Sequence, residues 1–144
     1  MSAMYLVIIA AVGGIAVALQ AQLMGSIDKH VGTLESVFVT YGGGGFIIGI
    51  IMILLRGGNL SSLSQVPWYT LLAGPTGLVL IAAIGYSVPR LGLVPAFTIL
   101  VAAQFMTAAL MDQFGLLGAE IRQISLSRVA GMVVMLAGIW LTLR

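Results

Sequence analysis

Charged residues are scarce in this 144-residue chain, in which Asp, Glu, Lys and Arg together make up 7% of the sequence. A soluble domain carries about a quarter of such residues, so this chain could not hydrate its own surface as a water-soluble globular protein. The 60% of hydrophobic residues and the mean hydropathy of +1.17 also exclude a disordered chain. The six basic residues do not cluster, so no nucleic-acid partner is expected.

Cysteine is absent and histidine occurs once. The chain therefore has no disulfide framework, no thiolate metal site and no cysteine nucleophile. The single histidine, His30, lies in a charged joint beside Lys29 and is expected to be solvated. The four carboxylates are scattered along the sequence and form no pair suited to catalysis. We therefore expect no enzyme activity, no metal and no cofactor.

Long apolar runs, punctuated by the few charges, dominate the sequence. A membrane-spanning helix needs about 20 mainly apolar residues. The segments that meet or approach this requirement are residues 4–24, 35–55, 67–88, 93–114 and 127–143. The N-terminal run is uncharged as far as Ile27, too long for the apolar part of a signal peptide. We predict an all-α integral membrane protein, with five transmembrane helices in one domain over residues 1–144.

Basic residues are divided evenly between the two faces that five crossings would create. One face would hold Lys29, Arg90 and Arg144, and the other Arg56, Arg122 and Arg128. Since orientation follows an excess of Lys and Arg on one side, this balance predicts no preferred orientation. Either another feature inserts the protein one way, or copies insert both ways and pair upside down. An odd number of helices would allow such an inverted pair to reproduce the two-repeat architecture of many transporters.

Glycine and proline mark the helices in which we expect packing or motion. Four consecutive glycines begin at Gly42, and Gly45 and Gly49 have the spacing of a close helix contact. Pro75 lies about eight residues into its segment and is predicted to kink it, whereas Pro95 lies in a first turn, where proline is tolerated. The second and third helices are thus candidates for moving or pathway-lining elements, with a fixed kink as the alternative.

Polar residues inside apolar helices are costly and are therefore candidates for function. We expect a substrate pathway or an ion-coupling role for Gln20, Glu35, Tyr41, Tyr86, Gln104, Thr107 and Asp112. A carboxylate within the membrane could exchange protons along a gradient. Three of these candidates also have a structural alternative. Glu35 could stabilise the positive end of its helix dipole, with Thr33 as the cap of that helix. Asp112 could form an ion pair with Arg122, and Gln104 could form an interhelical hydrogen bond.

Three stretches carry a resemblance to a known family. They are Pro-Arg-Leu-Gly at residues 89–92, Ala103-Gln104, and Met-Asp-Gln-Phe-Gly-Leu-Leu-Gly at residues 111–118. Together they resemble the YdcZ-like five-helix family of the drug/metabolite transporter superfamily, although Ala103 replaces a glycine and Gln113 a histidine of the family pattern. The resemblance implies a multi-pass protein of the bacterial inner membrane that exports small metabolites. It also implies kinship to small multidrug exporters that act as antiparallel dimers, but the acid that these use in helix one is absent here.

The resemblance and the residues together predict a transporter that works by alternating access. We expect two inverted copies, or one copy and an oppositely oriented paralogue, to rock around a cavity at the middle of the bilayer. The substrate should be small and neutral or weakly cationic, because no basic residue is central and the rings of Tyr41, Tyr86 and Phe97 can contact cations. The alternative is an accessory or assembly subunit that packs against a larger membrane protein and transports nothing.

Overall fold

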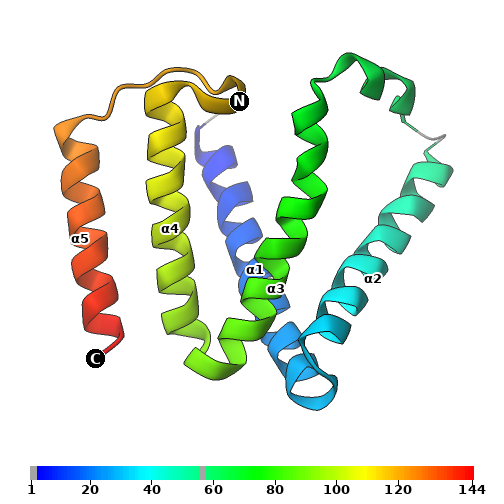
Figure 1. Cartoon of the computed structure of the whole chain (residues 1–144), viewed down its shortest axis with the longest axis horizontal. Coiled ribbons are helices and arrows are strands. Elements are labelled where there is room, and N and C mark those ends of the chain that lie inside the picture. The colour runs from blue at the N-terminus through cyan, green and yellow to red at the C-terminus, as the bar shows by residue number, and fades with distance from the viewer. Residues whose placement is uncertain (1–2, 56–57) are drawn as a thin grey trace. The chain divides into compact units, whose positions relative to one another are not determined.

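The computed structural model describes residues 3–55 and 58–144, and every regular element within these ranges is a helix (Figure 1). The α-helices are α1 (Ala3–Val31), α2 (Thr33–Leu54), α3 (Ala73–Leu91), α4 (Leu93–Phe114) and α5 (Leu126–Thr142). Short 3-10 helices η1 (Leu60–Gln65), η2 (Trp68–Leu72) and η3 (Leu116–Gly118) lie in the connections. The prediction of an all-α protein is confirmed. Arg56 and Gly57, expected in the second joint, lie outside the described residues.

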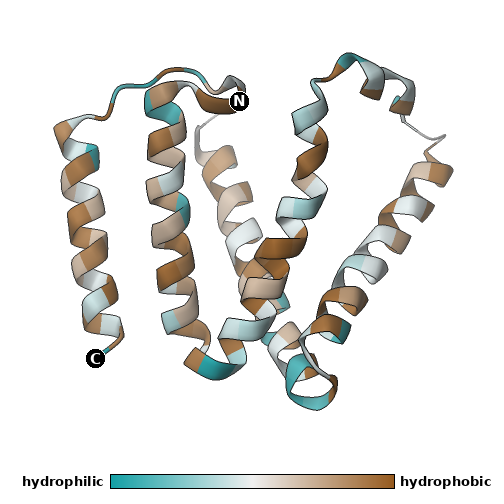
Figure 2. Cartoon of the chain, in the orientation of Figure 1, coloured by the Kyte–Doolittle hydropathy of each residue, from teal (hydrophilic) through white to brown (hydrophobic). Residues whose placement is uncertain are grey.

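Large hydrophobic side chains are exposed on all five α-helices. Apolar residues recur along the whole length of each helix (Figure 2). A helix that is hydrophobic all round belongs in a protein core or in a membrane. The helical stretches long and apolar enough to cross a bilayer are Met4–Val31, Thr33–Leu54, Trp68–Leu91 and Leu93–Phe114. The 17 residues of α5 are also apolar but reach only about 26 Å, just under the hydrocarbon thickness of about 30 Å. Four of the five predicted spans therefore have the required length.

The chain divides into one unit that ends at Arg90 and a second that begins at Leu91. In the first unit a single residue, Gly32, separates α1 from α2, whereas the sequence suggested a loop over residues 28–32. The helix continues through this charged stretch because the Lys29 cation in its last turn favours the negative end of its dipole. A ring nitrogen of His30 lies 2.8 Å from the Ser26 carbonyl oxygen of the same helix. Gly32 makes the turn with φ 110°, a backbone conformation open to glycine.

The predicted cap of α2 is wrong, because Gly32 and not Thr33 occupies the capping position, without a side-chain hydrogen bond. The Thr33 hydroxyl donates instead to the carboxylate of Asp28 on α1. This bond draws the start of α2 onto the end of α1, so it fixes the corner between the two helices.

The proline positions in α3 differ from those expected. Pro75 is the third residue of α3 and follows the 3-10 segment η2, so it does not interrupt an established α-helix. Proline is tolerated in a first turn, and the Thr76 hydroxyl donates to the Leu72 carbonyl oxygen at 2.9 Å. Pro89, expected in the third joint, instead lies inside α3, which continues to Leu91. Gly92, with φ 90°, is then the only residue between α3 and α4.

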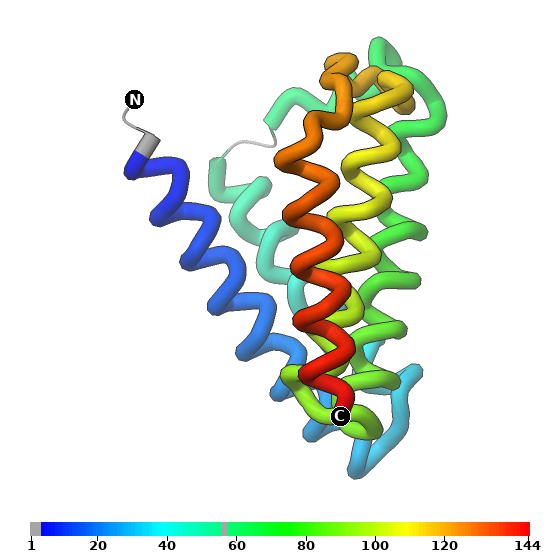
Figure 3. The backbone as a smooth tube through the Cα atoms, turned by 90° about the vertical axis from the view of Figure 1, so that its left-hand side faces the viewer, coloured from blue at the N-terminus to red at the C-terminus, as the bar shows by residue number. Residues whose placement is uncertain are grey.

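In the second unit, α4 and α5 run side by side (Figures 1 and 3). Pro95 lies in the first turn of α4, as expected, and Gly115 ends the helix in the left-handed conformation with φ 62°. Two hydrogen bonds hold the extended connection between α4 and α5 to the end of α4. The Ile124 N–H donates to Gln113 Oε1 at 2.8 Å, and the Arg122 N–H donates to the Asp112 carbonyl oxygen at 2.8 Å.

Candidate functional site

The first unit contains a pocket of about 470 Å³ that its three α-helices line. Its lining residues are Gln20 of α1, Thr40, Tyr41, Gly44 and Gly45 of α2, and Leu80 and Ile81 of α3. Gln20 and Thr40 also line a hollow of about 430 Å³ between α1 and α2. The fold thus brings together Gln20, Tyr41 and Gly45, three of the predicted site residues. None of the described residues that line these two spaces is charged.

Three side chains give the larger pocket its hydrogen-bonding capacity. The Thr40 hydroxyl donates to the Ser36 carbonyl oxygen of its own helix at 2.8 Å, so its oxygen can still accept a bond. Tyr41 reaches across to α3, where Gly77 makes room for it: a methyl group at Gly77 would lie 3.3 Å from Tyr41 Cζ. Gln20 adds an amide that both donates and accepts. Gly44 and Gly45 add backbone without side chains to the lining, and Leu80 and Ile81 of α3 add apolar side chains.

Tyr86 and Glu35 are not part of this lining. The guanidinium carbon of Arg90 lies 3.7 Å from the centroid of the Tyr86 ring. The chain's own cation thus covers the ring that the sequence offered to a cationic substrate. Glu35 lies in the first turn of α2 with its carboxylate against Gly32, where an added Cβ would be 2.7 Å from Oε2. A carboxylate in this position is favoured by the helix dipole.

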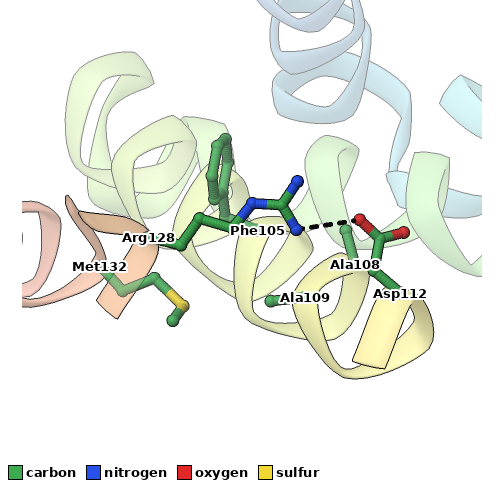
Figure 4. A pocket seen from close by; sticks show the side chains of 6 residues that line it. All are labelled: Phe105, Ala108, Ala109, Asp112, Arg128 and Met132. Carbon is green, nitrogen blue, oxygen red and sulfur yellow. Dashed lines mark hydrogen bonds and ion pairs between the residues drawn. The ribbon is translucent and has the colours of Figure 1, made fainter. Parts of the chain in front are cut away.

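A second pocket, of about 230 Å³, lies between α4 and α5 (Figure 4). The Asp112 carboxylate and the Arg128 guanidinium point toward one another across it and form an ion pair at 3.5 Å. The rest of its lining is apolar and consists of Phe105, Ala108, Ala109 and Met132. Gln104 and Thr107, predicted on the same helix, are exposed and lie outside this lining, and the Thr107 hydroxyl donates to the Ala103 carbonyl oxygen at 2.8 Å.

An ion pair of Asp112 with Arg122, the structural alternative considered for this carboxylate, is not formed, because the Arg122 backbone N–H donates to the Asp112 carbonyl oxygen while its guanidinium pairs with Glu120. The Arg122 guanidinium donates to Glu120 at 2.9 Å on the exposed connection between α4 and α5. This hydrogen bond, with the charges of Glu120 and then Asp112, raises the pKa of Arg122 above its ordinary value. Arg128 reaches Asp112 instead, since it lies in the first turn of α5, beside the end of α4.

The close helix contacts occur at glycines other than those predicted. In the described chain, a methyl group at Gly45 or Gly49 would meet no atom within 4 Å outside its own helix backbone. The tight positions are Gly25, 3.4 Å from Val88 Cγ1 when a Cβ is added, together with Gly77 and Gly85. Gly77 and Gly85 are eight residues apart and so lie on one face of α3. This spacing is visible in the sequence and could have identified the face of α3 that packs closely against its neighbours.

Comparison with known proteins gives one match. A family model described as "Putative inner membrane exporter, YdcZ" matches residues 5–141, which include nearly all of every α-helix. The searches of curated proteins and of solved structures each gave no match.

Proposed function

Because the chain belongs to the YdcZ family of inner membrane exporters, we propose that it exports small neutral or weakly cationic molecules. The substrate binds in the pocket lined by α1, α2 and α3. The observation that carries this proposal is a lining with three hydrogen-bonding side chains and no charge, between helices that are otherwise apolar. The volume of about 470 Å³ is within the range of pockets that bind small molecules.

The chemistry of the lining selects among substrates. An anion would enter a low-dielectric space without a cationic partner, which costs several kcal/mol. A neutral molecule can exchange its hydrogen bonds with water for bonds to Gln20, Thr40 and Tyr41. A weak cation can in addition lie against the Tyr41 ring, an interaction of about 0.5–2 kcal/mol.

Two inverted copies form the working unit of this proposal, and they alternate access to the pocket by rocking. The equal division of Lys and Arg, three against three, supports insertion in both orientations. The unfilled space beside Gly49, which does not line the pocket, supports close approach by another helix, because small residues let backbones meet in a membrane.

Ligand-dependent thermal unfolding of the purified protein tests the binding step. Monovalent amines and neutral amides should raise the unfolding temperature, and simple carboxylates should not, because a ligand stabilises the state that binds it. Compounds that stabilise are then tested for uptake into proteoliposomes. Gln20→Leu and Tyr41→Leu should abolish both effects.

Gln22→Leu is the matched control, since Gln22 is exposed on the same helix and does not line the pocket. Loss of binding in Gln22→Leu to the same extent, or stabilising ligands that are never transported, would contradict the proposal. The second of these results would favour the accessory-subunit alternative.

A further inference from the structure

The pocket between α1, α2 and α3 is closed toward the Gly32 corner by a layer of three buried residues. Each lies one helical turn, about 6 Å, beyond a residue of the pocket lining. They are Met24 beyond Gln20, Ser36 beyond Thr40, and Gly85 beyond Ile81. Ser36 is 0% exposed and donates from Oγ to the Met24 carbonyl oxygen at 3.0 Å. A methyl group on Gly85 would lie 3.3 Å from Met24 Cε, so α1 and α3 pack closely at this layer.

A group of polar side chains ties the same three helices together beyond this layer. The Asp28 carboxylate of α1 is only 5% exposed and accepts hydrogen bonds from the Thr33 hydroxyl of α2 and, at 3.2 Å, from Arg90 Nη1 of α3. Arg90 Nη1 also donates to the Tyr86 carbonyl oxygen at 2.6 Å. One carboxylate therefore connects all three helices that line the pocket.

Among the residues that the structure describes, the opposite end of the first unit shows no such closure. There α2 and α3 diverge from the corner (Figure 1), and methyl groups at Gly43, Gly49 or Gly74 would meet no atom within 4 Å outside their own helix backbone. Within the described ranges 3–55 and 58–144, packing and hydrogen bonds therefore close the first unit at the Gly32 end alone.

We propose that Asp28, Thr33 and Arg90 form a gate that closes the substrate pocket toward the Gly32 side of the membrane and opens when the Asp28–Arg90 pair separates. This inference rests on the proposed function, which makes the pocket the transport site. An ion pair suits a reversible gate, because water entering the opening solvates both charges and offsets the lost attraction. An apolar seal would instead expose hydrophobic surface each time it opened.

The absence of cysteine from the chain allows a direct test. A Ser36→Cys variant places one thiol in the sealing layer, where a water-soluble thiol reagent should react slowly with the purified protein. Adding Asp28→Asn or Arg90→Gln should speed this reaction about tenfold, which corresponds to about 1.4 kcal/mol in the opening equilibrium. The double exchange Asp28→Arg with Arg90→Asp should restore slow labelling.

Glu120→Gln is the matched control, since it breaks an ion pair on the exposed connection of the second unit. It should leave labelling of Ser36→Cys unchanged. All rates are measured well below each variant's unfolding temperature, so that opening of the gate is separated from unfolding. Equal labelling rates in Asp28→Asn, Arg90→Gln and Glu120→Gln would overturn the gate. Labelling requires no substrate, so this failure is distinct from a failure of the transport proposal.

Discussion

One added lysine should decide the orientation of this protein in the membrane. If the chain crosses the membrane five times, each face carries three Lys and Arg residues, and the two orientations are balanced. Ser64 and His30 are suitable positions because both are exposed and lie at opposite ends of the first unit, in η1 and in the last turn of α1. Ser64→Lys and His30→Lys each change the balance to four against three, in opposite directions.

The size of the effect follows from the interaction of a basic residue with an anionic leaflet, about 1 kcal/mol. From an even start, this energy corresponds to a ratio of about five to one between the two orientations. Ser64→Lys should therefore hold most copies with the η1 side in the cytoplasm, and His30→Lys should reverse them. Ser64→Glu is the control, because acidic residues contribute little to orientation.

Paired reporters fused after Arg144, one active only in the cytoplasm and one only outside it, measure the distribution. The unaltered chain should give signal from both reporters, and the two lysine variants should shift the signal in opposite senses. A single fixed side in the unaltered chain, unmoved by either lysine, would refute the balance of charges as the determinant of orientation. It would also remove the support that this balance gives to an inverted pair.

Three further predictions concern stability and coupling. Gly115→Ala should lower the free energy of unfolding by about 1–2 kcal/mol, because an alanine at this position is strained in the left-handed conformation. The loss should exceed that of Gly118→Ala. A Cβ at position 115 would lie 2.8 Å from a side-chain carbon of the α4–α5 connection, whereas a Cβ at position 118 would meet open space. Gly85→Val should lower the free energy of unfolding by about 1–3 kcal/mol, because it overpacks the layer formed by Met24, Ser36 and Gly85. Gly43→Ala should instead stabilise α2 by about 0.5–1 kcal/mol. Thermal unfolding measures the stability of all four glycine variants. Asp112→Asn should abolish any dependence of uptake on an imposed pH gradient, and unchanged dependence would exclude this carboxylate as a proton carrier.

The fold class could be predicted from the sequence because the apolar runs have the length and polarity of membrane helices. The exact ends could not be predicted from composition. Asp28, Lys29 and His30 are polar and suggested a loop, yet the Lys29 cation favours a helix C-terminus, and α1 continues to Val31. Pro89 likewise suggested a joint, but α3 continues past it, as a helix can when the lost backbone bond lies in its last turn.

Part of the lining of the proposed pocket could be predicted from the sequence. Gln20 and Tyr41 could be identified because polar groups are rare in these helices, and both line the pocket. Tyr86 was chosen by the same argument, which could not indicate that Arg90, one turn later on the helix, would cover its ring. Asp28 was overlooked because it lies in a charged stretch that was expected to be solvated. Only the tertiary structure shows its carboxylate enclosed by three helices.

Charged and uncharged polar side chains occupy different places in this chain, which has few charges. Three of its four carboxylates pair with arginines: Asp28 with Arg90, Glu120 with Arg122, and Asp112 with Arg128. The fourth, Glu35, lies in the first turn of a helix. All four thus lie near helix ends or on a connection, and the binding pocket is left with an amide and two hydroxyl groups. Charges that join helix ends can hold or release a conformation without competing for the substrate, and this arrangement is why we expect substitutions of Asp28 to change access and substitutions of Gln20 to change binding.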